Sequence, residues 1–252
     1  MLPLRDNIPT TRTAYVTYGL IVVNVLVYFF WQRGGLSLGD PTNLHYQCQL
    51  AEWAAVPKEI THGASDALPP QCGTDDANPY LTIFTAMFMH GGLLHLGGNM
   101  LFLWIFGNNV EDSMGRVKFL AFYLLAGLAA TAGQVLIGPN VAVPNVGASG
   151  AIAGVLGGYL VLFPRARVIT VIFIIFFFTI IELPAVLILG FWFLQQLLFG
   201  YFDLSDPTGG GGGVAYFAHI GGFAFGVLLI RVFANERRRR RQEELSRTGR
   251  GF

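Results

Sequence analysis

The chain has 252 residues, of which 53% are hydrophobic and only 12% are charged, and its mean hydropathy is +0.53. This composition is too apolar and too poor in charge for an ordinary soluble domain, so it predicts a membrane protein that crosses the bilayer several times. The formal net charge of +1 hides clusters of basic residues, which bear on the topology.

A membrane-spanning helix needs roughly 17 to 25 mostly apolar residues. Runs of this kind predict six spans, so we expect an all-α membrane protein built as a six-helix bundle. This membrane domain covers residues 14–233, between a cytoplasmic N-terminal segment 1–13 and a basic cytoplasmic tail 234–252. The six spans are predicted near residues 14–32, 86–108, 117–137, 147–163, 183–201 and 214–233.

The basic residues favour a topology with both termini in the cytoplasm. In that orientation all Lys and Arg residues except Arg33 and Lys58 lie on the inner side, as the positive-inside rule requires. The run Arg237–Arg241 in the tail is expected to contact anionic lipid headgroups of the bilayer. No nucleic-acid partner is expected.

The segments between the spans carry further predictions. The polar outer segment 34–81 is long enough to be functional, and Cys48 and Cys72 within it could form a disulfide if the outside is oxidising. Residues 107–112 predict an inner turn held by an interfacial ion-pair cluster. The stretch Val168–Ile181 is apolar but has only 14 residues, so we predict an interfacial or re-entrant segment without a turn of its own. The last outer loop, residues 203–213, ends in five glycines and is predicted to be flexible.

Two predicted helices combine a reactive side chain with a face of small residues. Ser149 opens one of them and His219 lies near the start of the other. Glycines spaced four apart allow two membrane helices to come into backbone contact, so these helices are predicted to pack together and bring the serine to the histidine. The glycines assigned to this packing are Gly150, Gly154, Gly222 and Gly226.

Acyl-transfer chemistry assigns a role to each polar residue. We expect Ser149 to attack a peptide carbonyl, and His219 to take its proton and return it to the leaving amine. The backbone N–H of Ser149, with the side chains of His95 and Asn99, which lie four apart on one helix face, holds the oxyanion.

Neither a catalytic acid nor a metal is predicted. No Asp or Glu lies in the predicted helical cores near these residues, so the sequence predicts a Ser-His dyad rather than a triad. The chain has no HExxH motif, and no metal or other cofactor is expected.

Three motifs follow one another along the chain: His95-xxx-Asn99, Gly147-Ala148-Ser149-Gly150 and Ala218-His219-Ile220-Gly221-Gly222. In this order they resemble the motifs of the rhomboid family of intramembrane serine proteases, in its bacterial six-helix form. The resemblance extends over about residues 81–233 and implies the same roles for the serine, the histidines and the asparagine. It also implies cleavage of transmembrane protein substrates near the outer membrane boundary, after small residues, in a cell membrane of the bacterial inner-membrane type.

Two departures from the family pattern concern how the site is held. Many members carry Trp-Arg before the second helix, where this chain has Leu81-Thr82, so the outer segment is expected to be held differently. Some members place an aromatic ring one turn after the serine, against the histidine, where this chain has Ala153. The orientation of the imidazole is therefore less secured.

Two other functions compete with proteolysis. A catalytically silent relative would bind membrane clients without cleaving them, and the retained serine and histidine disfavour it. A channel or transporter would show paired ionisable residues at the membrane midplane or an inverted repeat, and the sequence shows no repeat.

Overall fold

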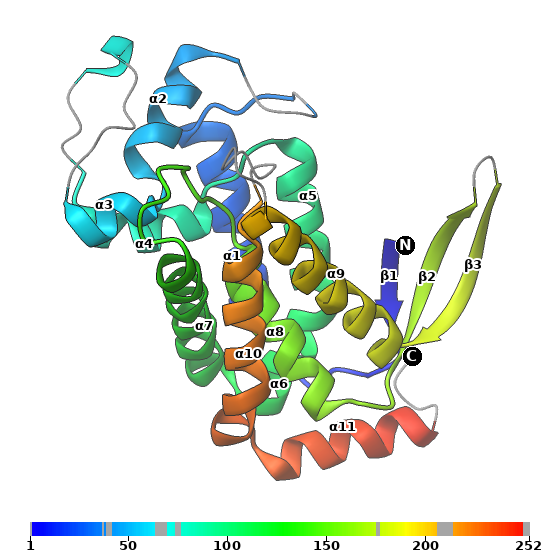
Figure 1. The fold of residues 1–252 in the computed structure, drawn as a ribbon. Coiled ribbons are helices and arrows are strands. Elements are labelled where there is room, and N and C mark those ends of the chain that lie inside the picture. The colour runs from blue at the N-terminus through cyan, green and yellow to red at the C-terminus, as the bar shows by residue number, and fades with distance from the viewer. Residues whose placement is uncertain are drawn as a thin grey trace.

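The computed structural model describes residues 2–36, 38, 42–63, 70–73, 77–174, 177–205 and 214–248, so the glycine run 209–213 and parts of the outer segment lie outside the described residues. Figure 1 shows a helical bundle with a small sheet at its side. The helices are α1 (Tyr15–Leu26) continued by η1 (Val27–Trp31), α2 (Leu44–Trp53), α3 (Pro57–His62), η2 (Pro70–Cys72), α4 (Pro79–Thr85), η3 (Ala86–Phe88), α5 (Leu93–Phe102), η4 (Leu103–Gly107), α6 (Asn108–Met114), α7 (Arg116–Ile137), α8 (Ser149–Leu162), α9 (Ala185–Ser205), α10 (Tyr216–Phe233) and α11 (Glu236–Thr248).

Among the residues that the structure describes, three helices are long and apolar enough to cross a membrane: α7, α9 and α10. The helix formed by α1 and η1, over Tyr15–Trp31, and helix α8 are apolar but shorter. Helices α5, η4 and α6 follow one another without a break over residues 93–114. Length and composition therefore confirm a membrane protein with several spanning helices, while the count of six stays a prediction.

Helix α8 is the centre of the bundle. Every residue from Gly150 to Tyr159 is buried, and the helix packs against both α7 and α10. Glycines make this approach possible, because a methyl group added to Gly222 would overlap the carbonyl oxygen of Gly150, and one added to Gly226 would overlap that of Gly154. The two helices thus meet backbone to backbone, as small-residue faces in membranes allow.

The expectation of an all-α fold is wrong in one region. The apolar stretch Val168–Ile181 forms most of two antiparallel strands, β2 (Arg167–Ile174) and β3 (Phe177–Pro184), and β2 also pairs with β1 (Leu2–Asp6). Every residue of this stretch is Val, Ile, Thr or Phe, the residue types that favour strands. The expectation that the stretch has no turn of its own is therefore also wrong, since its two halves pair with each other from Arg167 opposite Pro184 to Ile174 opposite Phe177.

The predicted inner turn over residues 107–112 is also wrong. Residues 108–114 are helical, and the reversal falls at Gly115, whose φ of +90° suits glycine. The carboxylate of Glu111 accepts hydrogen bonds from the backbone N–H groups of Val16 and Thr17, at 3.1 and 2.7 Å. It thereby caps the first turn of α1, whose own N-cap residue, Ala14, has no side chain that can do so. The described contacts of the Glu111 carboxylate are thus hydrogen bonds to a helix N-terminus and not the expected ion pairs. The N-terminus of a helix suits a carboxylate because it attracts negative charge.

The outer segment, residues 34–81, is hydrogen-bonded to Asn145 in the stretch that leads into α8. Cys48 and Cys72 are joined by a disulfide. Ala55 and Asn145 exchange two backbone hydrogen bonds of 3.0 and 2.9 Å. Thr85 Oγ1 donates to the carbonyl of Trp53 at 2.8 Å, which ties the outer segment to α4. The segment is held by these contacts in the absence of the Trp-Arg pair of the family pattern.

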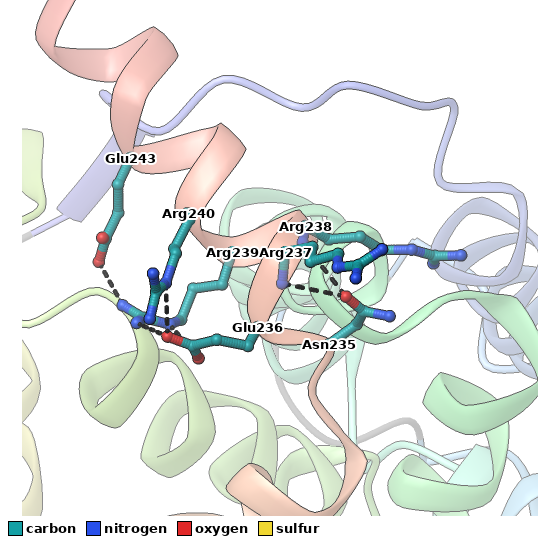
Figure 2. A network of polar contacts seen from close by, with 7 residues as sticks. All are labelled: Asn235, Glu236, Arg237, Arg238, Arg239, Arg240 and Glu243. Carbon is teal, nitrogen blue, oxygen red and sulfur yellow. Dashed lines mark hydrogen bonds and ion pairs between the residues drawn. The ribbon is translucent and has the colours of Figure 1, made fainter.

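The basic tail begins as a helix, α11, which runs across the end of the bundle where α10 ends (Figure 1). Figure 2 shows how its charges pair: Arg239 contacts both Glu236 and Glu243, and Arg240 also contacts Glu236. These arginines lower the pKa of Glu236 to about 2. Part of the basic run is thus engaged within the helix, and its contact with lipid headgroups stays a prediction.

The glycine contact between α8 and α10 can be tested against a glycine of α9. A methyl group at Gly190 would meet no heavy atom within 4 Å, unlike one at Gly222. We expect Gly222→Ala to lower the free energy of unfolding by about 1–3 kcal/mol, the usual cost of overpacking. Gly190→Ala should leave it unchanged or raise it, since alanine is the better helix former. Thermal unfolding in detergent compares the two, and equal melting temperatures would contradict the close contact.

Candidate active site

The packing of α8 against α10 brings the predicted serine and histidine together. Ser149 is the first residue of α8, next to Gly150, and His219 lies three residues before Gly222 in the first turn of α10. The distance from Ser149 Oγ to His219 Nε2 is 2.7 Å, a short hydrogen bond. A nucleophile and a base in this relation are the minimum required for serine acyl transfer.

A glutamine of α9 holds the other side of the imidazole. Gln196 Oε1 lies 2.8 Å from His219 Nδ1, and the Gln196 side chain is only 6% exposed. The amide nitrogen of Gln196 donates to the carbonyl of Trp192 at 3.4 Å, which leaves its oxygen to face the ring. Because that oxygen can only accept, Nδ1 of His219 carries the proton, and the lone pair of Nε2 faces the Ser149 hydroxyl.

An aromatic ring from α9 packs on the same imidazole. The ring centroids of Trp192 and His219 are 5.7 Å apart, with the planes tilted by 41°. Ala153, one turn after the serine, cannot supply such a contact. The ring that some family members place on the serine helix is thus replaced here by one from α9, and His219 is held by packing as well as by hydrogen bonds.

His95 and Asn99 lie together beside the turn that leads into α8. Gly147, with φ of +126°, forms this turn, and a methyl group there would be 2.8 Å from His95 Nε2 and 3.5 Å from Asn99 Nδ2. The backbone N–H of Gly91 donates to His95 Nδ1 at 3.2 Å, so Nε2 carries the ring proton. Both histidine and asparagine therefore present N–H donors next to the serine.

The amide nitrogen of Asn99 is a buried donor without a partner among the described residues. The side chain as a whole is 8% exposed. Leaving such a group unsatisfied costs about 1–3 kcal/mol. Ser149, His219, His95 and Asn99 all line one cavity of about 320 Å³, so an oxygen bound there could reach the free donor.

The groups around Ser149 and His219 do not include a cluster of metal ligands or a carboxylate against the imidazole, among the described residues. Within the described part of the chain, no group of three or more His, Cys, Asp and Glu residues is placed to hold a metal ion. The nearest orienting group to the base is a neutral amide, Gln196, rather than a carboxylate.

The family model for the rhomboid domain matches residues 77–236, which is more than half of the chain. The chain belongs to the rhomboid family. This rhomboid is 30% identical over 248 residues to "Rhomboid protein 1, mitochondrial" of Saccharomyces cerevisiae, covering 96% of this chain and 60% of the yeast protein. It is 32% identical over 216 residues to "Presenilin-associated rhomboid-like protein, mitochondrial" of Homo sapiens, covering 84% of this chain and 46% of the human protein.

A third relative carries an activity in its name. This rhomboid is 40% identical over 78 residues to "Rhomboid protease GluP" of Bacillus subtilis, covering 31% of this chain and 15% of that protein. The chain therefore spans less than two thirds of the length of each of these relatives. With its apolar helices, this rhomboid is a membrane protein.

The sequence analysis did not identify Gln196 and Trp192, the two residues of α9 that contact His219. Gln196 lies in a long apolar helix directly after Gln195, and neither is charged, so the search for a catalytic acid passed over them. One signal was available, because a polar side chain inside a spanning helix is costly unless it finds a partner. Trp192 lies four residues before Gln196 and therefore on the same helix face.

Proposed function

We propose that this rhomboid is an intramembrane serine endopeptidase that cleaves transmembrane segments of membrane proteins with a Ser149–His219 dyad. The observation that carries the proposal is the 2.7 Å hydrogen bond from the serine hydroxyl to the accepting nitrogen of the imidazole. A silent relative that only binds membrane clients has no need of a base with a fixed tautomer beside a serine. The buried, unpartnered amide of Asn99 further supports a site that binds a developing oxyanion.

The reaction follows from these contacts. Ser149 Oγ attacks the substrate carbonyl while its proton passes to His219 Nε2, and the oxyanion accepts hydrogen bonds from Asn99 Nδ2 and His95 Nε2. As the C–N bond breaks, His219 returns the proton to the leaving amine. Water then hydrolyses the acyl-enzyme by the same route, which restores the serine hydroxyl.

The place of cleavage follows from where the dyad lies in its helices. Ser149 opens α8 and His219 lies in the first turn of α10, so both are near one end of the bundle. Under the topology that the basic residues favour, this is the outer end, and both termini are cytoplasmic. We therefore place cleavage near the outer boundary of a cell membrane of the bacterial inner-membrane type, with transmembrane protein substrates reaching the site from the lipid bilayer.

Gln196 completes the proposed machinery as a positioning residue. Its oxygen holds His219 in the tautomer that can accept the serine proton, which is the orienting task of the acid in a Ser-His-Asp triad. A neutral amide performs it without placing a negative charge inside the bundle, where an unpaired charge is costly. The arrangement resembles the Cys-His-Asn sites in which an amide takes the place of the acid.

The dyad is tested with a fluorophosphonate probe, which reacts with activated serines. We expect the detergent-solubilised protein to be labelled, and Ser149→Ala and His219→Ala to lose labelling while they stay folded. Ser113→Ala is the matched control, because Ser113 is buried in α6 and its hydroxyl donates to the carbonyl of Val110, away from the site. Labelling that survives in Ser149→Ala would place the reactive serine elsewhere and contradict the assignment.

The role of Gln196 is tested by two substitutions with opposite expectations. Gln196→Met keeps the length of the side chain but removes the acceptor, whereas Gln196→Glu keeps an acceptor oxygen. We expect the rate constant of fluorophosphonate labelling to fall by about 10-fold or more in Gln196→Met, short of the roughly 10⁴-fold loss for the acid of a triad. Gln196→Glu should be labelled faster than Gln196→Met, because its carboxyl group keeps an acceptor oxygen for His219 Nδ1.

The matched control is Gln195→Met, which makes the same exchange at the neighbouring position. It should label like the native protein. If Gln196 served packing alone, the apolar Met would be tolerated better than Glu, so Gln196→Met labelling faster than Gln196→Glu would refute the positioning role. Thermal unfolding of all three variants separates loss of fold from loss of orientation.

A further inference from the structure

Three arginines from separate parts of the chain line a cavity at the end of the bundle opposite the dyad. Arg12 precedes α1, Arg116 is the first residue of α7, and Arg238 belongs to α11, which runs across that end (Figure 1). The cavity has a volume of about 230 Å³. Because α7 is a candidate spanning helix, its first residue lies at the membrane boundary. Under the topology that the basic residues favour, this is the cytoplasmic boundary.

Helix α11 is docked so that Arg238 has a fixed place. The backbone N–H of Asn235 and the buried side-chain amide of Gln242 donate to carbonyls of α6, at 2.9 and 3.3 Å. Between these two contacts Arg238 lies against Gly115, where a methyl group would be 2.5 Å from Arg238 Nη1. The guanidinium group therefore reaches the cavity from a segment that is held on both sides of it.

The carboxylates that line the cavity are engaged with the N-terminal part of the chain. Glu111 caps α1, and Asp112 accepts hydrogen bonds from the backbone N–H of Thr11 at 2.6 Å and from its hydroxyl at 2.9 Å. Among the described residues, neither carboxylate forms an ion pair with one of the three arginines. They offset part of the positive charge of the lining and leave the guanidinium groups without a carboxylate to bind.

The arginines keep donors that no described residue uses. Arg238 Nη1 is buried and has no hydrogen-bond partner among the described residues. Figure 2 shows this arginine outside the network around Glu236. The guanidinium of Arg116 lies over the ring of Tyr15, 4.4 Å from its centroid, a contact that orients it. A partly buried cation without a partner is costly, so a ligand with negatively charged oxygens is favoured here.

We propose that this cavity binds a phosphate group, as carried by the headgroup of an anionic phospholipid. Guanidinium groups match phosphate oxygens with paired, charge-assisted hydrogen bonds. Arg12 and Arg116 are exposed, so the ligand can enter from the surface of the bilayer. Basic pockets between spanning helices on the cytoplasmic side suit lipid headgroups. A free phosphate ion presents the same oxygens, but a lipid at this boundary also keeps its acyl chains in the bilayer.

The inference gives one arginine of the run Arg237–Arg241 a role that the others do not share. Arg239 and Arg240 contact carboxylates of α11 itself, whereas Arg238 lines the cavity. A specific site therefore predicts unequal effects of substitutions along the run, while a diffuse attraction to lipid predicts equal ones.

The test is thermal unfolding of the full-length protein in uncharged detergent, titrated with phosphatidylglycerol. A ligand that binds the folded protein raises its melting temperature as the ligand concentration rises. We expect Arg238→Gln to need about 10-fold or more phosphatidylglycerol for a given rise, the effect of one hydrogen bond to a charged group. Arg12→Gln should shift the titration in the same direction.

Arg237→Gln is the matched control. The backbone N–H groups of Arg237 and Arg238 both donate to Asn235 Oδ1, but only Arg238 lines the cavity. Arg237→Gln should therefore need the same lipid concentration as the native protein. Equal concentrations for the native protein, Arg237→Gln and Arg238→Gln would overturn the inference, because the tail would then attract lipid through its overall charge. Absence of any rise with phosphatidylglycerol would overturn it as well.

Two further titrations identify the source of the phosphate. Phosphatidylcholine with the same acyl chains should give a smaller rise, because its choline group adds a positive charge beside the arginines. A rise of the same size with inorganic phosphate, lost in Arg238→Gln, would support the site and overturn the lipid as its occupant. If Arg238→Gln unfolds earlier without any ligand, Arg12→Gln decides the test, since the Arg12 side chain makes no hydrogen bond or ion pair with a described residue. None of these measurements uses activity, so their failure would leave the proposed function untouched.

Discussion

The backbone contact between α8 and α10 is the constraint on which the rest of the structure depends. A serine hydroxyl and an imidazole reach hydrogen-bonding distance only if their helices approach far more closely than ordinary side chains permit. Gly222 against the carbonyl of Gly150, and Gly226 against that of Gly154, remove the side chains that would hold the helices apart. The dyad lies at the end of this contact, so its geometry follows from packing rather than from a dedicated loop.

The surrounding polar groups are satisfied with almost no charge. Gln196 fixes the tautomer of His219, and the backbone of Gly91 fixes that of His95. Both devices use neutral hydrogen bonds, which suits a region where buried charge is expensive. Carboxylates are buried elsewhere in the described chain, where Glu111 caps α1 and Asp6 accepts hydrogen bonds from Asn109 and Tyr159. Asn99 keeps one donor unpaired, a cost that a substrate oxyanion would offset.

The sequence predicted those parts of the structure that follow from helix periodicity. Ser149 and His219 stand at fixed spacings from glycines, and those spacings place both on faces that can meet. The paired strands β2 and β3 were not predicted, because Val168–Ile181 was judged only by whether it is long enough to span a membrane. Its Val, Ile, Thr and Phe residues favour strands. Gln196 was missed because its role depends on how α9 lies beside α10, which no local pattern encodes.

Helix α9 contributes to both the apolar cavity and the orientation of His219, and it does so with one face. Trp192 forms part of the apolar cavity wall and also packs on His219, while Gln196, one turn further on, orients the same ring. Because N–H···O hydrogen bonds in proteins have donor–acceptor distances of about 2.7–3.2 Å, a small displacement of α9 would break the contact that keeps the proton of His219 on Nδ1. The apolar wall of the cavity and the orientation of His219 therefore depend on the position of the same helix.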